Sequence, residues 1–281
     1  MNQKITLQNA FTLAEGGRSP LLYGDEETQG SPYLVKLGFT LAEVLITLGI
    51  IGVVAALTLP TLVQSYLEKQ RVTQLKTMVS RINQAIQQVE QEYGPIDTWG
   101  LTSTYQGVDE EGKNILEYSS GAVFMTRLAK YFKGATFMND KDIVAYVKAL
   151  DGRTAFYPWK VDSEDKRYLK LIDGTIITIG WVNCPAGTKS NCSDFWIVYP
   201  RKKDSQLGVD VFNFLLYPQK GLLPNGWNAR TGNLAPNCSK FSSNITASSA
   251  DRICTAWVYY NENMDYLHCD DLNWQTKTKC K

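Results

Sequence analysis

Apolar residues fill the chain almost without interruption from residue 39 to residue 59. A run of roughly 20 apolar residues is long enough to cross a lipid bilayer as a helix. A helix in the core of a globular protein is rarely so uniform on every face. The run therefore predicts a transmembrane helix rather than a buried one.

Beyond Pro60 the apolar residues form a single stripe. They are separated by alternating steps of three and four, which places them on one face of a helix: Val72, Leu75, Val79, Ile82, Ile86, Val89 and Tyr93. Charged and amide side chains lie between them, and Gly94-Pro95 ends the pattern with two helix-terminating residues. We expect one helix from residue 39 to residue 93. Pro60 is the expected position of a kink or local break, because proline removes one backbone donor.

The remaining residues, 95–281, alternate helix-like and strand-like segments. The expected helices are 119–133 and 140–150, and the expected strands are 168–172, 175–181, 194–199, 209–216 and 255–260. Asp173-Gly174 between the first two strands is a hairpin signal, and a turn at 219–221 leads into Leu222-Leu223. Strands joined by tight turns form antiparallel sheets. The predicted fold class is therefore α+β, with a long N-terminal helix packed on an antiparallel β-sheet head.

The net charge is close to zero, with 29 Lys and Arg against 28 Asp and Glu. Such a balance gives no general attraction to nucleic acid or to an anionic surface. The short basic run Arg201-Lys202-Lys203 is of a kind that is usually only solvated. Nucleic acid is therefore not an expected partner.

The six cysteines all lie in the last third of the chain: Cys184, Cys192, Cys238, Cys254, Cys269 and Cys280. None belongs to a Cys-x-x-Cys pair, and an even number confined to one region indicates disulfides. Disulfides persist in oxidising compartments outside the cytoplasm; buried free thiols are the alternative. The first two bracket a turn-like loop and are expected to pair. The other two pairs follow by proximity, although six cysteines allow 15 connectivities.

The apolar run is preceded by Gly38-Phe39-Thr40-Leu41-Ala42-Glu43. Glu43 is the only acidic or basic residue between Phe39 and Leu67. A charge at membrane depth costs ~2.5–3.5 kcal/mol even on a lenient insertion scale, so Glu43 needs a compensating partner. Phe11-Thr12-Leu13-Ala14-Glu15 repeats the last five residues of this segment. No apolar run follows this first copy, so it cannot insert in a membrane as the second copy can.

The motif resembles the N-terminal processing site of type IV pilins and type II secretion pseudopilins, from Gly38 to about Val63. The resemblance implies that a prepilin peptidase cuts after Gly38 and methylates the new N-terminal Phe39. It also implies that Glu43 pairs with the N-terminal amine of a neighbouring subunit and so assists subunit assembly.

The resemblance divides the chain into four parts: a leader peptide at 1–38, a transmembrane and filament-core helix at 39–63, an amphipathic continuation at 64–94 and a globular pilin-like head at 95–281. The cysteine-rich end corresponds to the disulfide-bearing region of pilin heads. The protein is then a single-pass protein of the inner membrane with its head outside the cytoplasm. From there it would enter a filament at the cell surface or in the periplasm.

The implied function is structural and not enzymatic: a subunit of a type IV pilus or a type II secretion pseudopilus. The implied partners are the prepilin peptidase, like or related pilin subunits and the inner membrane. The alternative is a membrane-anchored binding module, a glycan or surface adhesin that uses a pilin-like anchor. The head contains six tryptophans from Trp159 onward that could furnish a sugar-binding surface, although aromatic core is the simpler explanation.

His268 is the only histidine, so any catalytic triad or Cys-His nucleophile would have to use it. A zinc site there would compete with the disulfides for the same thiols, and we expect neither. Glu262, Asp265, Asp270 and Asp271 form an acidic cluster of the type that calcium favours. Major pseudopilins carry calcium in this general region, but no recognised loop spacing is present. We therefore expect solvated acidic surface, with calcium as the alternative and no other cofactor.

Overall fold

In the computed structural model the chain forms two compact units, residues 1–53 and 54–281. The residues that the structure describes are 40–102, 105–108, 114–116, 119–138, 147–150, 152, 154–156, 167–200, 205–232, 234, 238 and 253–280. The leader and the expected cleavage residues Gly38 and Phe39 lie outside them.

Helix α1 (Leu41–Tyr93) is the helix that the apolar pattern predicts, and it runs through Pro60 without a break. The first unit holds its residues up to Val53. In the second unit, the buried residues of α1 are those of the predicted stripe from Val72 to Val89, together with Met78 and Ala85. Tyr93, the last residue of the stripe, is partly buried and packs against the same core. The stripe therefore supplies one side of the hydrophobic core of the head.

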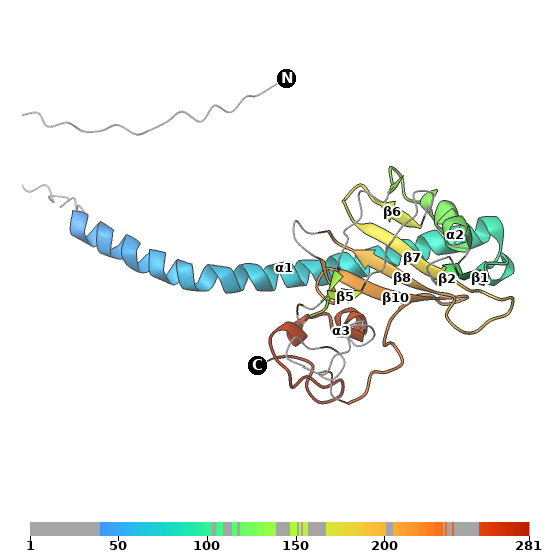
Figure 1. The fold of residues 1–281 in the computed structure, drawn as a ribbon. Helices are drawn as coiled ribbons and strands as arrows, with labels where there is room; N and C mark the ends of the chain where they lie inside the picture. The colour runs from blue at the N-terminus through green and yellow to red at the C-terminus, as the bar shows by residue number, and fades with distance from the viewer. Residues whose placement is uncertain are drawn as a thin grey trace, which may run out of the picture. The chain divides into compact units, whose positions relative to one another are not determined.

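A six-stranded sheet supplies the other side of this core (Figure 1). Its order is β11-β10-β8-β7-β6-β3, and every pair in it is antiparallel, as predicted. The strands are β3 (Thr136–Phe137), β6 (Tyr168–Lys170), β7 (Ile176–Val182), β8 (Ser193–Val198), β10 (Val211–Tyr217) and β11 (Gly221–Pro224). Asp173-Gly174 forms the expected turn between β6 and β7, with Gly174 at φ +84° and the Asp173 carboxylate accepting from the Thr175 amide at 3.0 Å.

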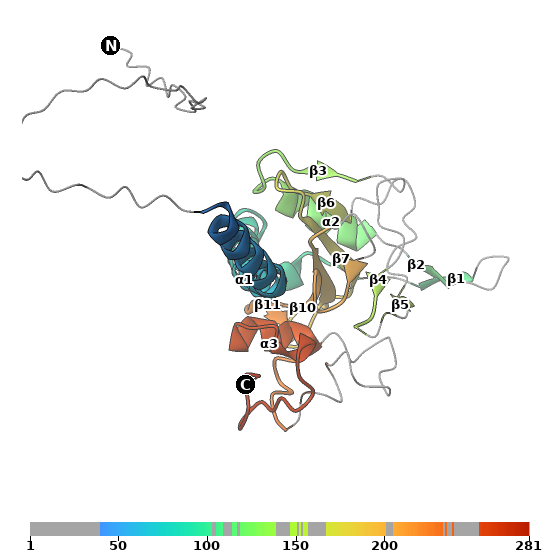
Figure 2. The same cartoon turned by 90° about the vertical axis from the view of Figure 1, so that its left-hand side faces the viewer.

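Both faces of the sheet are covered. Phe195 and Ile197 of β8 join α1 in the larger core, whereas Trp196 and Val198 belong to a smaller cluster on the opposite face. Helix α2 (Ser119–Ala129), shorter than the predicted 119–133, packs on β6 and β7. Helix α3 (Cys254–Asn261) packs on β10 and β11, so the two helices lie toward different ends of the strand order (Figure 2).

The predicted strand at 255–260 is wrong, because this segment forms α3. Its residues are apolar at consecutive positions, and such a short run does not reveal its period. The side-chain oxygen of Thr255 accepts a hydrogen bond from the Asn213 amide of β10 at 2.9 Å, and Trp257 is fully buried. Tertiary contacts thus decide the local structure over the strand propensity of Val258-Tyr259-Tyr260.

The predicted helix at 140–150 is wrong where it can be followed, since Val147–Lys148 is strand β4. Residues 140–146 lie outside the described part of the chain. Strand β4 pairs antiparallel with β5 (Thr154–Phe156) and parallel with β9 (Ser205–Gln206) in a separate three-stranded sheet. This pairing joins segments far apart in sequence, so no local pattern predicts it. The other described elements are the pair β1 (Tyr105–Val108) and β2 (Asn114–Leu116) and the 3₁₀ turns Ile96–Thr98 and Asp265–Leu267.

Edge strand β11 is attached to α1 by Asn83. The Asn83 side-chain oxygen accepts a hydrogen bond from the Leu222 amide at 2.8 Å. A Cβ atom placed on Gly221 would lie only 2.5 Å from that oxygen, and Gly221 adopts φ +70°. Glycine is therefore required at this turn both for its backbone conformation and for the close approach of the helix.

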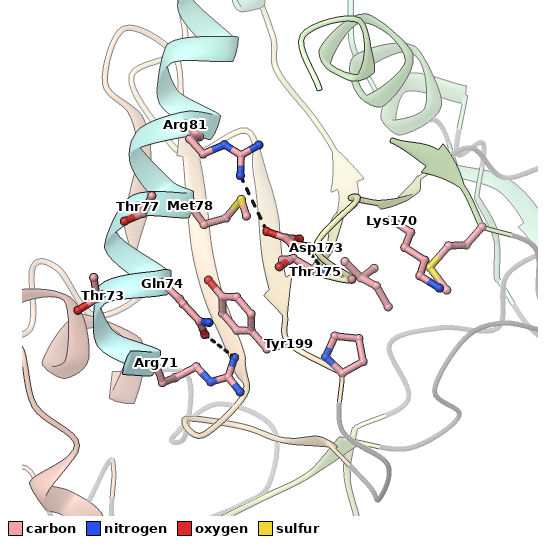
Figure 3. A pocket seen from close by; sticks show the side chains of 14 residues that line it. Arg71, Thr73, Gln74, Thr77, Met78, Arg81, Lys170, Asp173, Thr175 and Tyr199 are labelled. Atoms are coloured by element: carbon pink, nitrogen blue, oxygen red, sulfur yellow. Dashed lines mark hydrogen bonds and ion pairs between the residues drawn. The ribbon is translucent and has the colours of Figure 1, made fainter. Parts of the chain in front are cut away.

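The second unit also contains a cavity of about 530 Å³ between α1, the β6–β7 hairpin and the end of β8 (Figure 3). Side chains from Arg71 to Arg81 of α1 form one wall, and Lys170 to Ile176 form the opposite wall. Tyr199 and Pro200, which directly follow β8, also line it.

Candidate functional site

The part of α1 in the first unit is apolar and exposed. Its large apolar side chains include Leu41 at 78%, Leu45 at 61% and Val53 at 62% exposure. An exposed apolar surface of this extent is typical of an interaction or membrane surface. Within the described residues, α1 is the one helix long and apolar enough to cross a membrane, and none of its most apolar window is buried. By length and composition, α1 is able to span a membrane.

The second unit begins with further exposed apolar residues on α1. They extend from Val54 to Leu67 and include Leu57 at 74% exposure. From Glu68 onward charged and polar side chains alternate with the buried stripe that begins at Val72. The change from exposed apolar surface to buried apolar stripe therefore falls between Leu67 and Val72.

Glu43 lies in the first turn of α1, where it forms a capping box with Thr40. The Glu43 carboxylate accepts hydrogen bonds from the Thr40 amide and from the Thr40 hydroxyl, both at 2.8 Å. The Thr40 hydroxyl oxygen in turn accepts from the Glu43 amide at 3.2 Å. This reciprocal pattern satisfies backbone donors that a helix start leaves without partners. The Thr-x-x-Glu spacing is its sequence signal, which the assignment of Glu43 to assembly alone had overlooked.

Three disulfides join Cys184 to Cys192, Cys238 to Cys254 and Cys269 to Cys280. These are the three pairs expected from proximity along the chain. The loop closed by the first pair is held to the segment that follows α1, because the Gly187 amide donates to the Asp97 carboxylate at 3.1 Å.

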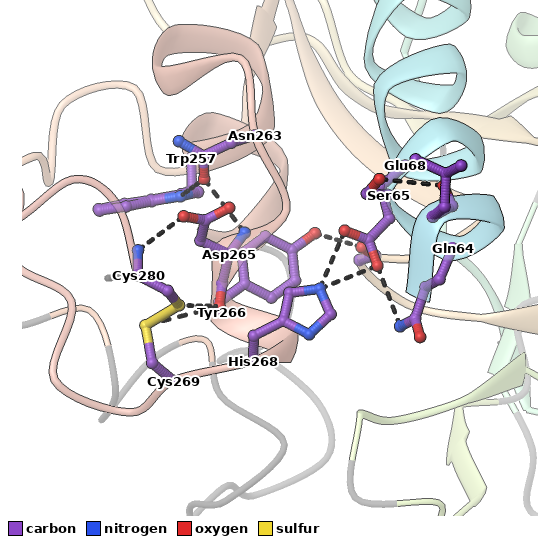
Figure 4. A network of polar contacts seen from close by, with 12 residues as sticks. Gln64, Ser65, Glu68, Trp257, Asn263, Asp265, Tyr266, His268, Cys269 and Cys280 are labelled. Atoms are coloured by element: carbon purple, nitrogen blue, oxygen red, sulfur yellow. Dashed lines mark hydrogen bonds and ion pairs between the residues drawn. A yellow bond between two sulfur atoms is a disulfide. The ribbon is translucent and has the colours of Figure 1, made fainter. Parts of the chain in front are cut away.

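The last residues of the chain are organised by two side chains, Asn263 and Asp265 (Figure 4). The Asn263 side-chain oxygen accepts from the Trp257 indole at 2.9 Å and from the Asp265 amide at 3.1 Å. Its amide nitrogen donates to the Thr278 carbonyl at 3.0 Å. The Asp265 carboxylate accepts from the Cys280 amide at 2.7 Å. These contacts and the Cys269–Cys280 disulfide hold the C-terminal segment against α3.

The same C-terminal region contacts α1 through two pairs of side chains. His268 Nε2 lies 2.9 Å from Glu68 Oε2, within hydrogen-bond distance, and the Lys76 ammonium forms an ion pair with the Glu262 carboxylate. The hydrogen bond from Lys76 lowers the pKa of Glu262 below its usual value. Glu68 and Lys76 are thus contact residues that sequence reasoning missed, and no local signal marks them because their partners are distant in sequence.

Three carboxylates of the acidic cluster have separate partners in the structure. Glu262 pairs with Lys76, Asp265 binds the Cys280 amide and Asp271 pairs with Lys277. In the described part of the chain, no three or more His, Cys, Asp or Glu side chains are grouped so that they could hold a metal ion. His268 is instead a contact residue for α1.

These features define an α+β protein with an exposed apolar N-terminal helix and a disulfide-bridged C-terminal region. The chain belongs to the family described as a family of unknown function (DUF6613), whose model matches residues 61–264. The match begins directly after Pro60, so it covers the amphipathic part of α1 and most of the head. No curated protein and no solved structure matches the chain.

Proposed function

We propose that this protein is a prepilin-like structural subunit. In this proposal the apolar part of α1 holds the precursor in the inner membrane, and a prepilin peptidase removes residues 1–38 and methylates Phe39. The subunit then assembles with like or related subunits into a type IV pilus or a type II secretion pseudopilus. The observation that carries the proposal is the Gly38-Phe39 motif, placed directly before a helix whose start is exposed and apolar.

The two kinds of surface on α1 support the proposal. Residues from Leu41 to Leu67 expose large apolar side chains, as required of a segment that lies in lipid and later packs in a filament core. Residues from Val72 to Val89 bury their apolar stripe in the head. One helix therefore carries both an anchor-like surface and the attachment of a folded head.

The three disulfides support a head outside the cytoplasm. Bacterial disulfides form in the periplasm or beyond it, whereas cytosolic thiols are kept reduced. The described residues contain no free cysteine. A head that folds outside the cytoplasm, next to a membrane-inserted helix, fits the orientation that the proposal requires.

The test is co-expression of the full chain with a prepilin peptidase, followed by intact-mass measurement and N-terminal analysis. The expected product begins at N-methylated Phe39. A Gly38→Leu variant is the matched control and should stay uncut, because the peptidase needs an unhindered residue before the scissile bond. No product should begin near Phe11. A mature protein with another N-terminus, or cleavage that does not depend on the peptidase, would overturn the proposal.

A further inference from the structure

The cavity beside α1 has the size of a ligand site. Its volume of about 530 Å³ lies inside the range of roughly 300–1,000 Å³ that is usual for small-molecule sites. The described residues that line it all belong to the second unit. The cavity therefore lies apart from the N-terminal part of α1 in the first unit.

The described residues that line the cavity carry an excess of positive charge. Among them, Arg71, Arg81 and Lys170 are cationic, and Asp173 is the one carboxylate. One Asp173 oxygen accepts from the Thr175 amide, and the other lies 3.9 Å from Arg81 Nη1, at the outer limit of an ion pair. Because these contacts hold the Asp173 carboxylate in the hairpin turn, it offsets only part of the positive charge of the lining. The site therefore favours an anionic ligand.

The cations are spread along the cavity rather than gathered at one point. Arg71 and Arg81 are ten positions apart on α1, which corresponds to about 15 Å at ~1.5 Å per residue. Figure 3 shows their side chains at opposite ends of this wall. A single phosphate or carboxylate cannot contact both guanidinium groups, whereas an extended ligand with an anionic group near each end can.

Arg71 is held in position at its end of the cavity. Its guanidinium lies 4.3 Å from the centre of the Tyr199 ring and donates to the Gln74 side chain at 3.1 Å. A guanidinium fixed by stacking loses little freedom when it binds a carboxylate. Tyr199 is 7% exposed, and its buried hydroxyl has no hydrogen-bond partner among the described residues. A ligand oxygen that reaches beneath Arg71 would accept the proton of this hydroxyl.

The rest of the lining suits a hydroxylated skeleton. Thr175 places a hydroxyl and Gln74 an amide along the cavity (Figure 3), and Met78 and Ile176 supply apolar surface. Hydroxyls and amides both donate and accept hydrogen bonds, as sugar hydroxyls do. We propose that the cavity binds an acidic oligosaccharide with carboxylates on separate sugar units, one contacting Arg71 and the other contacting Arg81, while Lys170 adds to the positive field.

The test is calorimetric titration of the full chain in detergent micelles. The probes are tri-galacturonate, galacturonate, neutral maltotriose and inorganic phosphate. We expect tri-galacturonate to bind at least tenfold more tightly than galacturonate or phosphate, with an affinity that falls as salt is added, and maltotriose not to bind. Equal affinity for phosphate, equal affinity for maltotriose, or the absence of tri-galacturonate binding would overturn the proposal.

Variants show whether binding occurs in this cavity. Arg81→Gln should weaken tri-galacturonate binding about tenfold or more, because a charge-assisted hydrogen bond is lost. Lys170 is exposed, so the second cavity variant, Lys170→Gln, should fold as the wild type does, and it should weaken binding by a smaller factor. Lys69→Gln removes the same charge from α1 outside this cavity and should leave binding unchanged. Wild-type affinity in both cavity variants, or an equal loss in Lys69→Gln, would place binding elsewhere and overturn the proposal.

Discussion

His268 Nε2 lies 2.9 Å from Glu68 Oε2, which connects two residues 200 positions apart in the chain. Together with the Lys76–Glu262 pair, this contact attaches the C-terminal region to α1 at two points. The His268 side chain is 40% exposed and the Glu68 side chain 17% exposed, and polar pairs that solvent reaches contribute only ~0–1 kcal/mol. The two contacts therefore orient the C-terminal region, while covalent bonds and buried contacts stabilise it.

The first prediction compares the Cys269–Cys280 disulfide with the His268–Glu68 pair. The double substitution Cys269→Ser and Cys280→Ser should lower the free energy of unfolding by roughly 2–4 kcal/mol. His268→Gln should lower it by less than about 1 kcal/mol, since solvent reaches the His268 side chain, which is 40% exposed. Chemical denaturation of the purified full-length variants in detergent measures both values. An effect of His268→Gln as large as that of the disulfide would contradict the view that the two contacts only orient the region.

The second prediction separates the two roles of Glu43. Glu43→Gln and Glu43→Ala should keep membrane insertion and cleavage, because the scissile residues are unchanged and a costly charge is removed. Both should reduce filament assembly, measured as sheared filaments relative to the membrane fraction. The reason is that the Phe39 amine of a neighbouring subunit would lose its acidic partner.

Thr40→Val is the control for this second prediction. It removes the hydroxyl from the capping box at a cost of about 1 kcal/mol in helix stability, but it keeps the Glu43 charge. We expect it to assemble nearly as well as the wild type. If Thr40→Val fails like Glu43→Gln, capping of α1 rather than pairing between subunits explains the defect.

The third prediction concerns the buried hydroxyl of Tyr199. Tyr199→Phe should raise the free energy of unfolding by ~0.5–2 kcal/mol at pH 7, because a buried hydroxyl without a partner is removed and the ring is kept. Burial also raises the pKa of Tyr199 above its ordinary value. The unfolded chain ionises its tyrosines near pH ~10, so it binds fewer protons than the folded chain above that pH, and stability falls as the pH rises further.

The free energy of unfolding of Tyr199→Phe should fall less than that of the wild type as the pH rises above ~10. Thermal unfolding between pH 7 and pH 11 measures the effect, and Tyr260→Phe is the matched control because Tyr260 is more exposed. Parallel pH profiles for wild type and Tyr199→Phe would contradict a raised pKa of Tyr199 in the folded protein.

The fourth prediction concerns the close approach of Asn83 to Gly221. Gly221→Ala should destabilise the protein by roughly 1–3 kcal/mol, through its positive φ and the clash with the Asn83 oxygen. Gly232→Ala is the matched control, because Gly232 adopts φ +71° and no atom of the described residues lies within 4 Å of the added carbon. It should cost less than Gly221→Ala.

Asn83→Ala tests the same contact from the helix side. It should cost about 1–3 kcal/mol by leaving the Leu222 amide without its acceptor. Combined with Gly221→Ala, it should cost less than the sum of the two single changes, because the clashing oxygen is gone. Strict additivity in denaturation experiments would mean that the two residues do not meet in solution.

Sequence reasoning succeeded where one local pattern determines the structure. The stripe from Val72 to Val89 is buried as its spacing indicates, and Asp173-Gly174 forms the expected turn. It failed at α3, whose consecutive apolar residues carry no period, and at β4, whose partner β9 is distant in sequence. The assembly role of Glu43 stays a prediction, whereas its hydrogen bonds with Thr40 could have been predicted from the Thr-x-x-Glu spacing alone. The contact between His268 and Glu68 depends on tertiary structure, so no local sequence pattern predicts it.

The edges of the six-stranded sheet determine whether neighbouring copies of the head could join their sheets in a filament. An open edge strand offers unpaired amides and carbonyls on which another chain can add a strand, which leads to aggregation. Here β3 has two residues, and β11 ends in Pro224 and has its Leu222 amide engaged by Asn83. Neither edge therefore offers a long template for strand addition. Heads packed at high local density can touch side by side while their sheets stay separate.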